Sequence, residues 1–413
     1  MADSVNFSSD FFKANRERLR EKLGEDKLVI VTANGMLQRN SDIGFPFRQD
    51  SNFWYLTGID SADVVLVMDG AEEYLIVPTR DEIHAKFDGV INPDKMSEIS
   101  GVAMFYGLDE GWAKLAARIK DMAAVSVLDA PNQYIEGANM YTNPSRNRLI
   151  AQLKELHAGL KLEDIREQLM ELRVIKQPIE IEAIQRAIDI TVDSLQTIVA
   201  PDSFAGFAAE YELEAELTRL FRRQRSGHAF EPIVASGARA CQLHYIDNDG
   251  LVEKDQLLIF DVGAEVSNYA ADVARTYVSG QATGRQIAVY EAVCRVQDYA
   301  FSLLKPGISN FEYEKQVETY MGEQLRGLGL IKGDDSDDIR QYFPHMTSHF
   351  LGLDTHDVGD YREPLRAGMV LTCEPGIYIP EEGIGVRIED DVLITESGCE
   401  VLSKRLPRSL SGQ

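Results

Sequence analysis

The chain is poor in cysteine and in positive charge, and each shortage excludes a class of protein. Its four cysteines are too widely scattered for a disulfide framework or a zinc finger; they are Cys241, Cys294, Cys373 and Cys399. Lysine and arginine together number 42 against 67 acidic residues, which gives a formal net charge of -25. We therefore expect no nucleic-acid binding, because phosphate backbones recruit basic surfaces.

Long hydrophobic runs are also missing. No run approaches the roughly 20 apolar residues that a membrane-spanning helix needs. The first residues, MADSVNFSSDFF, contain neither the basic nor the apolar region of a secretory signal peptide. The hydrophobic share of 44% and the charged share of 26% are those of an ordinary globular protein. These features predict a cytoplasmic protein without a membrane segment.

A length of 413 residues suffices for two domains. In the first part of the chain, helical and strand-like patterns alternate, which predicts an α/β domain over residues 1–172. The predicted strands are Lys27–Thr32, Val64–Met68, Tyr74–Pro78 and Ala124–Leu128, and the predicted helices are Phe12–Leu23, Trp112–Met122 and Asn147–His157. Within this domain, Arg39–Gly58 is rich in charge, aromatics and glycine, and we expect it to be a loop.

The pattern is helical almost throughout Leu162–Ala200 and is interrupted at Pro178. The residues before this proline form the predicted junction between the domains, because a residue before proline tends to leave the helix. Residues 173–413 then form the second domain. Its predicted helices are Glu180–Ile198, Glu210–Arg223, Gly284–Leu304 and Asn310–Leu328.

The candidate site is built around residues 256–277. An apolar run ends there in Asp261, and a second strand-like run carries Asp272. A hairpin centred between Val266 and Ser267 would set position 261 directly opposite position 272. Two carboxylates that face each other at a strand end must share a proton or a cation.

Two further carboxylates follow apolar strands near the C-terminal end of the chain. The apolar run that begins at Met369 ends in Glu374, just before a Pro-Gly pair. The segment GVRIEDD alternates, so that Arg387, Glu389 and Asp391 share one face of a strand. Four acidic side chains thus arrive at strand ends beside turn-forming glycines.

A buried site cannot hold the four charges of Asp261, Asp272, Glu374 and Glu389 without compensation. Two divalent cations would supply it, and two metals about 3.5–4 Å apart activate water for hydrolysis. Oxygen-rich ligation with a single imidazole suits Mn²⁺ first, with Co²⁺, Fe²⁺ or Zn²⁺ as alternatives. Spacing alone leaves open whether the histidines of the segment HMTSHFLGLDTH are ligands or packing residues.

Motifs in both domains resemble those of aminopeptidase P, the Xaa-Pro aminopeptidases of the creatinase and methionine-aminopeptidase ("pita-bread") superfamily. The matching motifs are RNSDIGFPFRQDSNFWYLTG at 39–58, LHY at 243–245, DVGAEVSNYAADVART at 261–276, TSHFLGLDTHDVG at 347–359, GMVLTCEPGIYI at 368–379 and GIGVRIEDDVLIT at 383–395. The resemblance implies an α+β protein, in which a creatinase-like α/β domain precedes a pita-bread metallopeptidase domain.

The resemblance also implies a set of metal ligands. Asp261 would bind one metal ion, and Asp272 and Glu389 would bridge both ions. His349 and Glu374 would bind the second ion, and Glu374 would act as the general base toward the attacking water.

Further residues would handle the substrate. His244 and His356 would line its pocket, stabilise the intermediate and help to protonate the leaving proline nitrogen. His345 would face the proline, and Tyr378 and Arg387 would support the ligands through hydrogen bonds and charge relay.

The sequence departs from the family pattern at a few positions. Met346 stands where glycine is common, and Arg239 stands where a small amide is frequent. Neither residue would touch a ligand, but both could reshape the pocket for the residue after the scissile bond. The stretch 359–368 is a few residues short of some relatives, so no arginine of that stretch is assigned a role.

The resemblance implies removal of the N-terminal residue from peptides with proline in second position. A prolidase, which cleaves Xaa-Pro dipeptides, is the alternative, because it uses the same five ligands. Ser348 before the ligand histidine and the segment LGLD after it favour the aminopeptidase. The complete ligand set argues against a creatinase-type hydrolase and against a metal-free binding module. Relatives are usually dimers or tetramers, and Arg39–Gly58 is the candidate contact with a neighbouring subunit.

Overall fold

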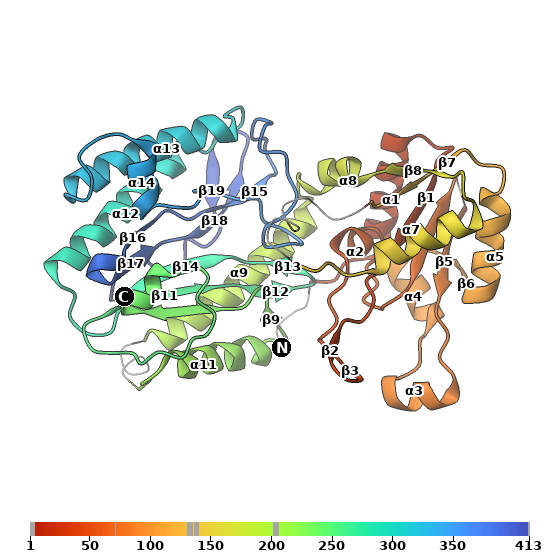
Figure 1. Cartoon of the computed structure of the whole chain (residues 1–413), viewed down its shortest axis with the longest axis horizontal. Helices are drawn as coiled ribbons and strands as arrows, with labels where there is room; N and C mark the ends of the chain where they lie inside the picture. The colour runs from red at the N-terminus through yellow and green to blue at the C-terminus, as the bar shows by residue number, and fades with distance from the viewer. Residues whose placement is uncertain (1–4, 71, 130–134, 136–139, 201–205, 412–413) are drawn as a thin grey trace. The chain divides into compact units, whose positions relative to one another are not determined.

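Two units make up the chain, residues 6–172 and residues 173–413 with 1–5. The computed structural model describes residues 5–70, 72–129, 135, 140–200 and 206–411 (Figure 1). The elements of the first unit are α1 (Ser9–Leu23), β1 (Leu28–Thr32), β2 (Gln38–Asn40), β3 (Ile43–Gly44), α2 (Ser51–Thr57), β4 (Val65–Asp69), β5 (Glu72–Val77), α3 (Glu82–Asp88), α4 (Pro93–Ser100), β6 (Met104–Gly107), α5 (Leu108–Ile119), β7 (Ala124–Val127), α7 (Ser145–Leu156), β8 (Lys161–Asp164) and α8 (Arg166–Arg173), which ends at the boundary.

A mixed six-stranded sheet in the order β6-β5-β4-β1-β7-β8 forms the centre of the first unit. The pairs β1–β4 and β4–β5 are antiparallel, and the outer pairs β5–β6, β1–β7 and β7–β8 are parallel. Leu115 of α5 and Leu153 of α7 pack with Ile30 and Val67 in one buried cluster. Helices therefore cover a face of the sheet, which confirms the predicted α/β architecture.

Two predictions for this unit are wrong. The segment Arg39–Gly58 is a short β2–β3 ribbon followed by helix α2, not a loop. The Asp50 carboxylate accepts hydrogen bonds from the N–H groups of Asn52 and Phe53 at the helix start, and Gly58 ends the helix with φ +67°. Strand β8 lies at the start of the stretch expected to be helical, because pairing with β7 overrides its local helical pattern.

The second unit contains more numerous and shorter sheets. Its elements are α9 (Pro178–Ile198), α11 (Glu210–Arg223), β9 (Gly227–His228), β10 (Ile233–Ser236), the 3-10 helix η1 (Gly237–Cys241), β11 (Leu257–Val262), β12 (Ala264–Val266), β13 (Tyr269–Ala270), β14 (Val273–Val278), α12 (Gly284–Leu303), α13 (Asn310–Gly327), α14 (Ser336–Tyr342), β15 (Val370–Cys373), β16 (Gly376–Ile379), the 3-10 helix η2 (Pro380–Glu382), β17 (Ile384–Arg387), β18 (Asp390–Ile394) and β19 (Cys399–Val401).

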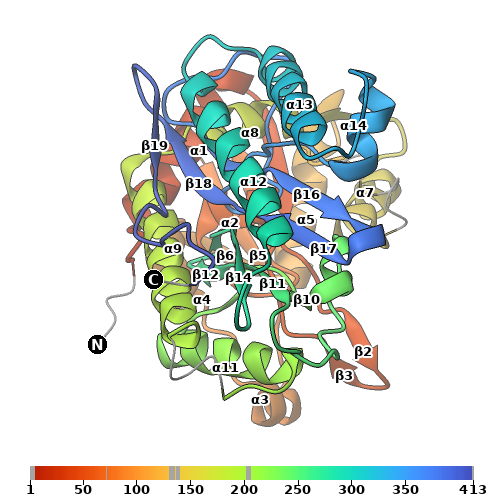
Figure 2. The same cartoon turned by 90° about the vertical axis from the view of Figure 1, so that its left-hand side faces the viewer.

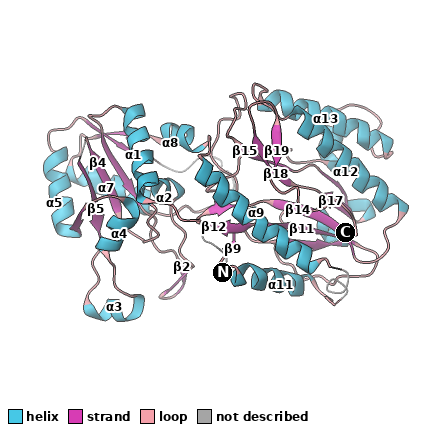
Figure 3. Cartoon of the chain, turned by 180° about the vertical axis from the view of Figure 1, so that it is seen from behind, coloured by secondary structure: helices cyan, strands magenta, loops and turns pink. Residues whose placement is uncertain are grey.

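Helices cover this second unit on opposite sides of its strands. Helices α12 and α13 lie on one side of β16 and β17, and α9 and α11 lie beyond β11 on the other side (Figures 1 and 2). Direct contacts join α12 to β15, β16 and β17, and join α11 to β10. Figure 3 shows the same layering from behind. Among the described residues, no helix combines the length and the apolar character needed to cross a lipid bilayer.

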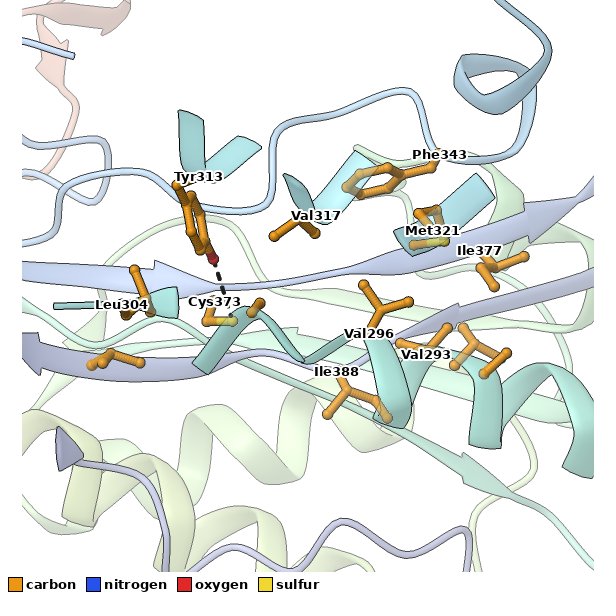
Figure 4. Close-up of a cluster of buried hydrophobic side chains, with 14 of the residues drawn as sticks. Val293, Val296, Leu304, Tyr313, Val317, Met321, Phe343, Cys373, Ile377 and Ile388 are labelled. Atoms are coloured by element: carbon orange, nitrogen blue, oxygen red, sulfur yellow. Dashed lines mark hydrogen bonds between the residues drawn. The ribbon is translucent and has the colours of Figure 1, made fainter. Parts of the chain in front are cut away.

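A large buried cluster fixes the strands that lead into the site. Val296 of α12 and Val317 of α13 pack in it with Ile388 and Cys373 (Figure 4). The Tyr313 hydroxyl lies 3.8 Å from the Cys373 sulfur. Because Cys373 and Ile388 are adjacent to two of the candidate carboxylates, close packing behind these strands holds the carboxylates in place.

The predicted hairpin forms, but its register is shifted. Asp261 pairs with Ala274, not with Asp272. The turn is formed by Ser267 and Asn268, whose φ angles are +49° and +65°, as a two-residue turn with left-handed conformation requires. Its centre lies one residue later than expected, so Asp272 is a diagonal neighbour of Asp261 on the same face.

Candidate metal centre and active site

Four carboxylates enter the site from the ends of separate strands. Asp261 lies near the end of β11, and Asp272 immediately precedes β14. Glu374 follows β15, where its N–H donates to the Thr347 carbonyl at 2.8 Å. Glu389 lies between β17 and β18, where its N–H donates to the carbonyl of Ala274 at 2.9 Å, next to the hairpin. Backbone pairing between segments far apart in sequence therefore brings the acids together.

His349 presents its Nε2 atom to two of these acids. Its Nδ1 lies 3.0 Å from the carbonyl oxygen of Phe350, which can only accept, so Nδ1 carries the proton. The Nε2 atom lies 3.5 Å from Asp272 Oδ2 and 3.4 Å from Glu374 Oε1. In this neutral tautomer an unprotonated nitrogen faces two carboxylates. A cation bound between the three groups would attract all of them.

The geometry and burial of the acids also fit a cation. Ligand atoms of Asp272, His349 and Glu389 lie within 4.8 Å of one another. Asp261 Oδ1, Asp272 Oδ1 and Glu389 Oε1 are buried with no hydrogen-bond partner among the described residues. Ligands that are each about 2.1 Å from a common ion lie roughly 3.0–3.4 Å from one another, close to the spacing around His349. The donor set is thus suited to oxygen-preferring divalent metals.

Burial and mutual repulsion favour the protonated form of three of these carboxyl groups, because they raise the pKa values of Asp272, Glu374 and Glu389. Burial and then the negative charge of Asp261 raise the pKa of Asp272 well above its ordinary value. Burial and then the charges of Asp272 and Glu374 do the same to the pKa of Glu389. Burial raises the pKa of Glu374 to about 8, with a further contribution from Asp272 that His349 opposes. Divalent cations would displace these protons and relieve the repulsion.

A chain of hydrogen bonds runs from Asp261 to His345. Arg387 Nη2 donates to Asp261 Oδ2 at 2.6 Å, and Arg387 Nη1 donates to the Tyr378 hydroxyl at 3.3 Å. His345 Nδ1 lies 2.9 Å from the Met346 carbonyl and carries the proton, so the Tyr378 hydroxyl donates to His345 Nε2 at 2.9 Å. Burial, followed by repulsion from Arg387, lowers the pKa of His345 to about 3. Its imidazole is therefore neutral at pH 7.

His244 and His356 are the exposed imidazoles of the site. The rings of His356 and His349 meet edge to face, with centroids 4.4 Å apart. Partial desolvation, and then repulsion from His349 and His244, lower the pKa of His356 to about 4. His244 also acts electrostatically on His345. The structure therefore places His356 against His349, and His244 within electrostatic reach of His345 and His356.

Two polar neighbours of the site were not predicted as site residues. The Thr372 hydroxyl donates to Glu374 Oε1 at 3.3 Å and accepts from the N–H of His349 at 3.1 Å. The two-residue period of a strand places Thr372 on the same face as Glu374, and this signal could have found it. Asp391 Oδ2 accepts from the N–H of Asp272 at 3.1 Å. Only the fold brings that pair together.

Family models match both units of the chain. Residues 182–396 match the model "Metallopeptidase family M24", and residues 12–127 match "Aminopeptidase P, N-terminal domain". The first match covers all five candidate metal ligands, and the second lies within the unit 6–172.

Full-length relatives and solved structures agree with these matches. The chain is 32% identical to the Xaa-Pro aminopeptidase of Haemophilus influenzae over 100% of this chain and 98% of that protein. It is also 32% identical to human Xaa-Pro aminopeptidase 3, over 94% and 80% of the two chains. Aminopeptidase P of Escherichia coli with the inhibitor Pro-Leu superposes with a TM-score of 0.87 at 29% identity, over 98% and 97% of the chains. A zinc-substituted form of that enzyme in complex with product gives a TM-score of 0.86.

The matches extend over both units, and the candidate ligands all lie within the metallopeptidase match. The chain therefore belongs to metallopeptidase family M24, within its aminopeptidase P branch of metallo-aminopeptidases.

Proposed function

We propose that this protein is a two-metal Xaa-Pro aminopeptidase that removes the N-terminal residue from peptides with proline in second position. The observation that carries the proposal is the convergence of one imidazole, three buried acids and the partly buried Glu374. Each of the three buried acids has an oxygen without a hydrogen-bond partner among the described residues. Mn²⁺ is the metal that such a donor set favours first. The names of the relatives favour the aminopeptidase over a prolidase.

Asp261, Asp272, His349, Glu374 and Glu389 would hold the two ions. When bound, the ions supply an activated water and stabilise negative charge on the scissile carbonyl. The Arg387 guanidinium holds Asp261 Oδ2, which leaves Oδ1 for ligation. His349 is held by its Nδ1–H with Nε2 directed at the acids. The protein thereby orients the ligands before the metals arrive.

Selection of proline requires recognition by shape. An Xaa-Pro bond has no N–H, so a site cannot hold it through that hydrogen. His345 is neutral, and both of its ring nitrogens are engaged, by Met346 and by Tyr378. Its ring is therefore a rigid wall beside Glu374, whose Oε2 lies 3.7 Å from His345 Nδ1. In our proposal this wall receives the proline ring.

Proton transfer would be shared between Glu374 and the exposed histidines. Glu374 would take the proton of the attacking water as general base. The leaving group is a secondary amine that must gain a proton as the intermediate collapses. In our proposal His356 and His244 face the substrate and would carry that proton or donate a hydrogen bond to the intermediate.

The test compares initial rates on an Xaa-Pro dipeptide, an Xaa-Pro-Yaa tripeptide and a longer Xaa-Pro peptide with added Mn²⁺. An Xaa-Ala-Yaa tripeptide is the matched control for proline selection. We expect cleavage after the first residue of the tripeptide and the longer peptide, and slow cleavage of the alanine analogue. Fast cleavage of the dipeptide with no turnover of the longer peptides would establish the prolidase alternative instead.

A further inference from the structure

The carboxylate of Glu210, the first residue of α11, is a buried centre of hydrogen bonding outside the metal site. Its Oε1 accepts from the N–H and the hydroxyl of Ser236, both at 2.7 Å, and from Arg239 Nε at 2.9 Å. Its Oε2 accepts from the Tyr245 hydroxyl and from the N–H of Gly250, both at 2.7 Å. Glu210 itself is fully buried. Five donors among the described residues thus meet on one carboxylate.

These hydrogen bonds are strong enough to keep the group ionised. Burial acts to raise the pKa of Glu210, but the hydrogen bonds from Ser236, Tyr245 and Arg239 outweigh it and lower the pKa below its ordinary value. At neutral pH the bonds are therefore charge-assisted and shorter than bonds between neutral groups. Removal of the charge would leave Arg239 without its acidic partner and several donors without a good acceptor.

All five donors come from the loop of residues 236–250, which carries His244. The next residue along the chain, Tyr245, packs its ring in a buried cluster with Tyr378. The previous residue, Leu243, accepts a long hydrogen bond of 3.5 Å from Arg387. One side of the loop is thus held by Glu210 and the other side contacts the active site.

Arg239 links the two ends of this loop by hydrogen bonds. Its Nη2 donates to the Ser236 hydroxyl at 2.8 Å and to the Leu251 carbonyl at 3.0 Å, which joins the two ends of the loop. The guanidinium lies against Gly250, where an added Cβ would come within 2.1 Å of Arg239 Cζ. The position of the loop therefore depends on Glu210 and Arg239 together, and Gly250 leaves the space for them.

We propose that Glu210 is a positioning residue that sets the place of the His244 imidazole through its bonds to Tyr245 and Arg239. The inference rests on the function proposed above, in which His244 acts on the substrate. If Glu210 had a merely structural role, its replacement would lower stability whether or not His244 is present. If Glu210 positions His244, the effect of replacing Glu210 on activity depends on the presence of His244.

A double-mutant cycle separates these roles. Glu210→Gln should lower kcat/KM for an Xaa-Pro-Yaa peptide by about 10²-fold, because a misplacement of about 1 Å costs that much. Tyr245→Phe keeps the ring and removes the contacts of the hydroxyl with Glu210 and Asp249, and it should cost about tenfold. In a His244→Ala background, each change should alter kcat/KM by less than about twofold. Glu216→Gln, a change at a partly exposed acid on the same helix, is the control and should change neither background.

Hydrogen exchange supplies a readout that does not depend on activity. Peptides from residues 236–250 should exchange faster in Glu210→Gln than in the wild type, while peptides from α12 stay unchanged. A wild-type chain that cleaves no Xaa-Pro-Yaa peptide would overturn the proposed function, and the exchange data would still decide whether Glu210 holds this loop. Unchanged exchange, or equal fold losses with and without His244, would overturn the positioning role.

Discussion

Arg387 and Asp261 form a buried ion pair at the edge of the metal centre. Their Nη2 and Oδ2 atoms lie 2.6 Å apart, and the two side chains are 6% and 12% exposed. Burial acts against the charged guanidinium, but Asp261 outweighs it and raises the pKa of Arg387 above its ordinary value. The arginine therefore supplies a permanent positive charge and fixes the orientation of a metal ligand.

Replacement of Arg387 by lysine should show that the geometry of the guanidinium group matters in addition to its positive charge. A lysine ammonium is a point charge and cannot hold Asp261 and the Tyr378 hydroxyl as the two guanidinium nitrogens do. We expect Arg387→Lys to lower metal affinity or kcat/KM by about 10–100-fold, as measured by metal titration and initial rates. Arg219→Lys makes the same change in an exposed pair with Glu216 and is the control. Equal effects of the two variants would contradict the orienting role.

A metal assay should distinguish variants of the proposed metal ligands from a variant of His356. Asp272→Asn and Glu389→Gln each remove a proposed bridging charge, so each should abolish turnover and weaken metal loading. His356→Ala should retain both metals and lose about 10²–10⁴-fold in rate, because it would act on the substrate. Elemental analysis should find about two metals per chain in the wild type and in His356→Ala. An emptied site in His356→Ala would assign that residue to the metals instead.

Metal-free protein should lose stability as the pH rises. The pKa of Glu374 is about 8 in the folded state against an ordinary value of 4.5, so between these values the folded chain retains a proton that the unfolded chain has released. The contribution of Glu374 to stability is therefore complete below about pH 4.5 and is lost as the pH rises through about 8.

Glu374→Gln isolates this effect, because the amide does not titrate. With metals removed, the Tm of the variant relative to the wild type should increase from pH 5 to pH 8. Added Mn²⁺ should raise the Tm of the wild type at pH 8, because the ion binds only the folded state. A Tm difference that does not vary with pH would show that Glu374 holds no extra proton in the folded chain.

Local patterns predicted which side chains face the site. Alternation along GVRIEDD predicted one strand with Arg387 and Glu389 on one face. Both residues are buried at the site and Ile388 packs in the core, but the segment is not one strand, because β17 ends at Arg387 and β18 begins at Asp390. Asp261 and Glu374 were identified because each ends an apolar run, and such a run is typical of a buried strand. Helix ends with a strong signal were also predicted, as at Gly24 after α1.

Contacts that depend on register or on distant segments were beyond prediction. The hairpin register was missed because Ser267, rather than a more typical turn residue, takes a left-handed conformation beside Asn268. The bonds of Glu210 to a loop that begins at Ser236 follow only from the way α11 packs on β10. Nothing in the local pattern of either segment indicates that contact.

Gly263 offers a test of how strictly the hairpin positions Asp272. It lies between β11 and β12, where an added Cβ would come within 1.7 Å of the Ala271 carbonyl oxygen. At this point the hydrogen bond from the Ala271 N–H to the Ala264 carbonyl, 3.0 Å long, holds the two arms of the hairpin together. The backbone therefore has no room for a methyl group unless the ribbon opens beside Asp272.

Gly263→Ala should lower the free energy of unfolding by about 3 kcal/mol and should also weaken metal binding, because the displaced strand carries Asp272. Urea unfolding of metal-free protein measures the first effect, and metal titration of the folded protein measures the second. Gly284→Ala is the matched control, since nothing lies within 4 Å of its Cβ position at the start of α12. That variant should match or slightly exceed the wild type in stability, because alanine suits a helix better than glycine. Normal metal affinity in Gly263→Ala would mean that the site tolerates an open ribbon and that Asp272 is placed by its bond to Asp391 instead.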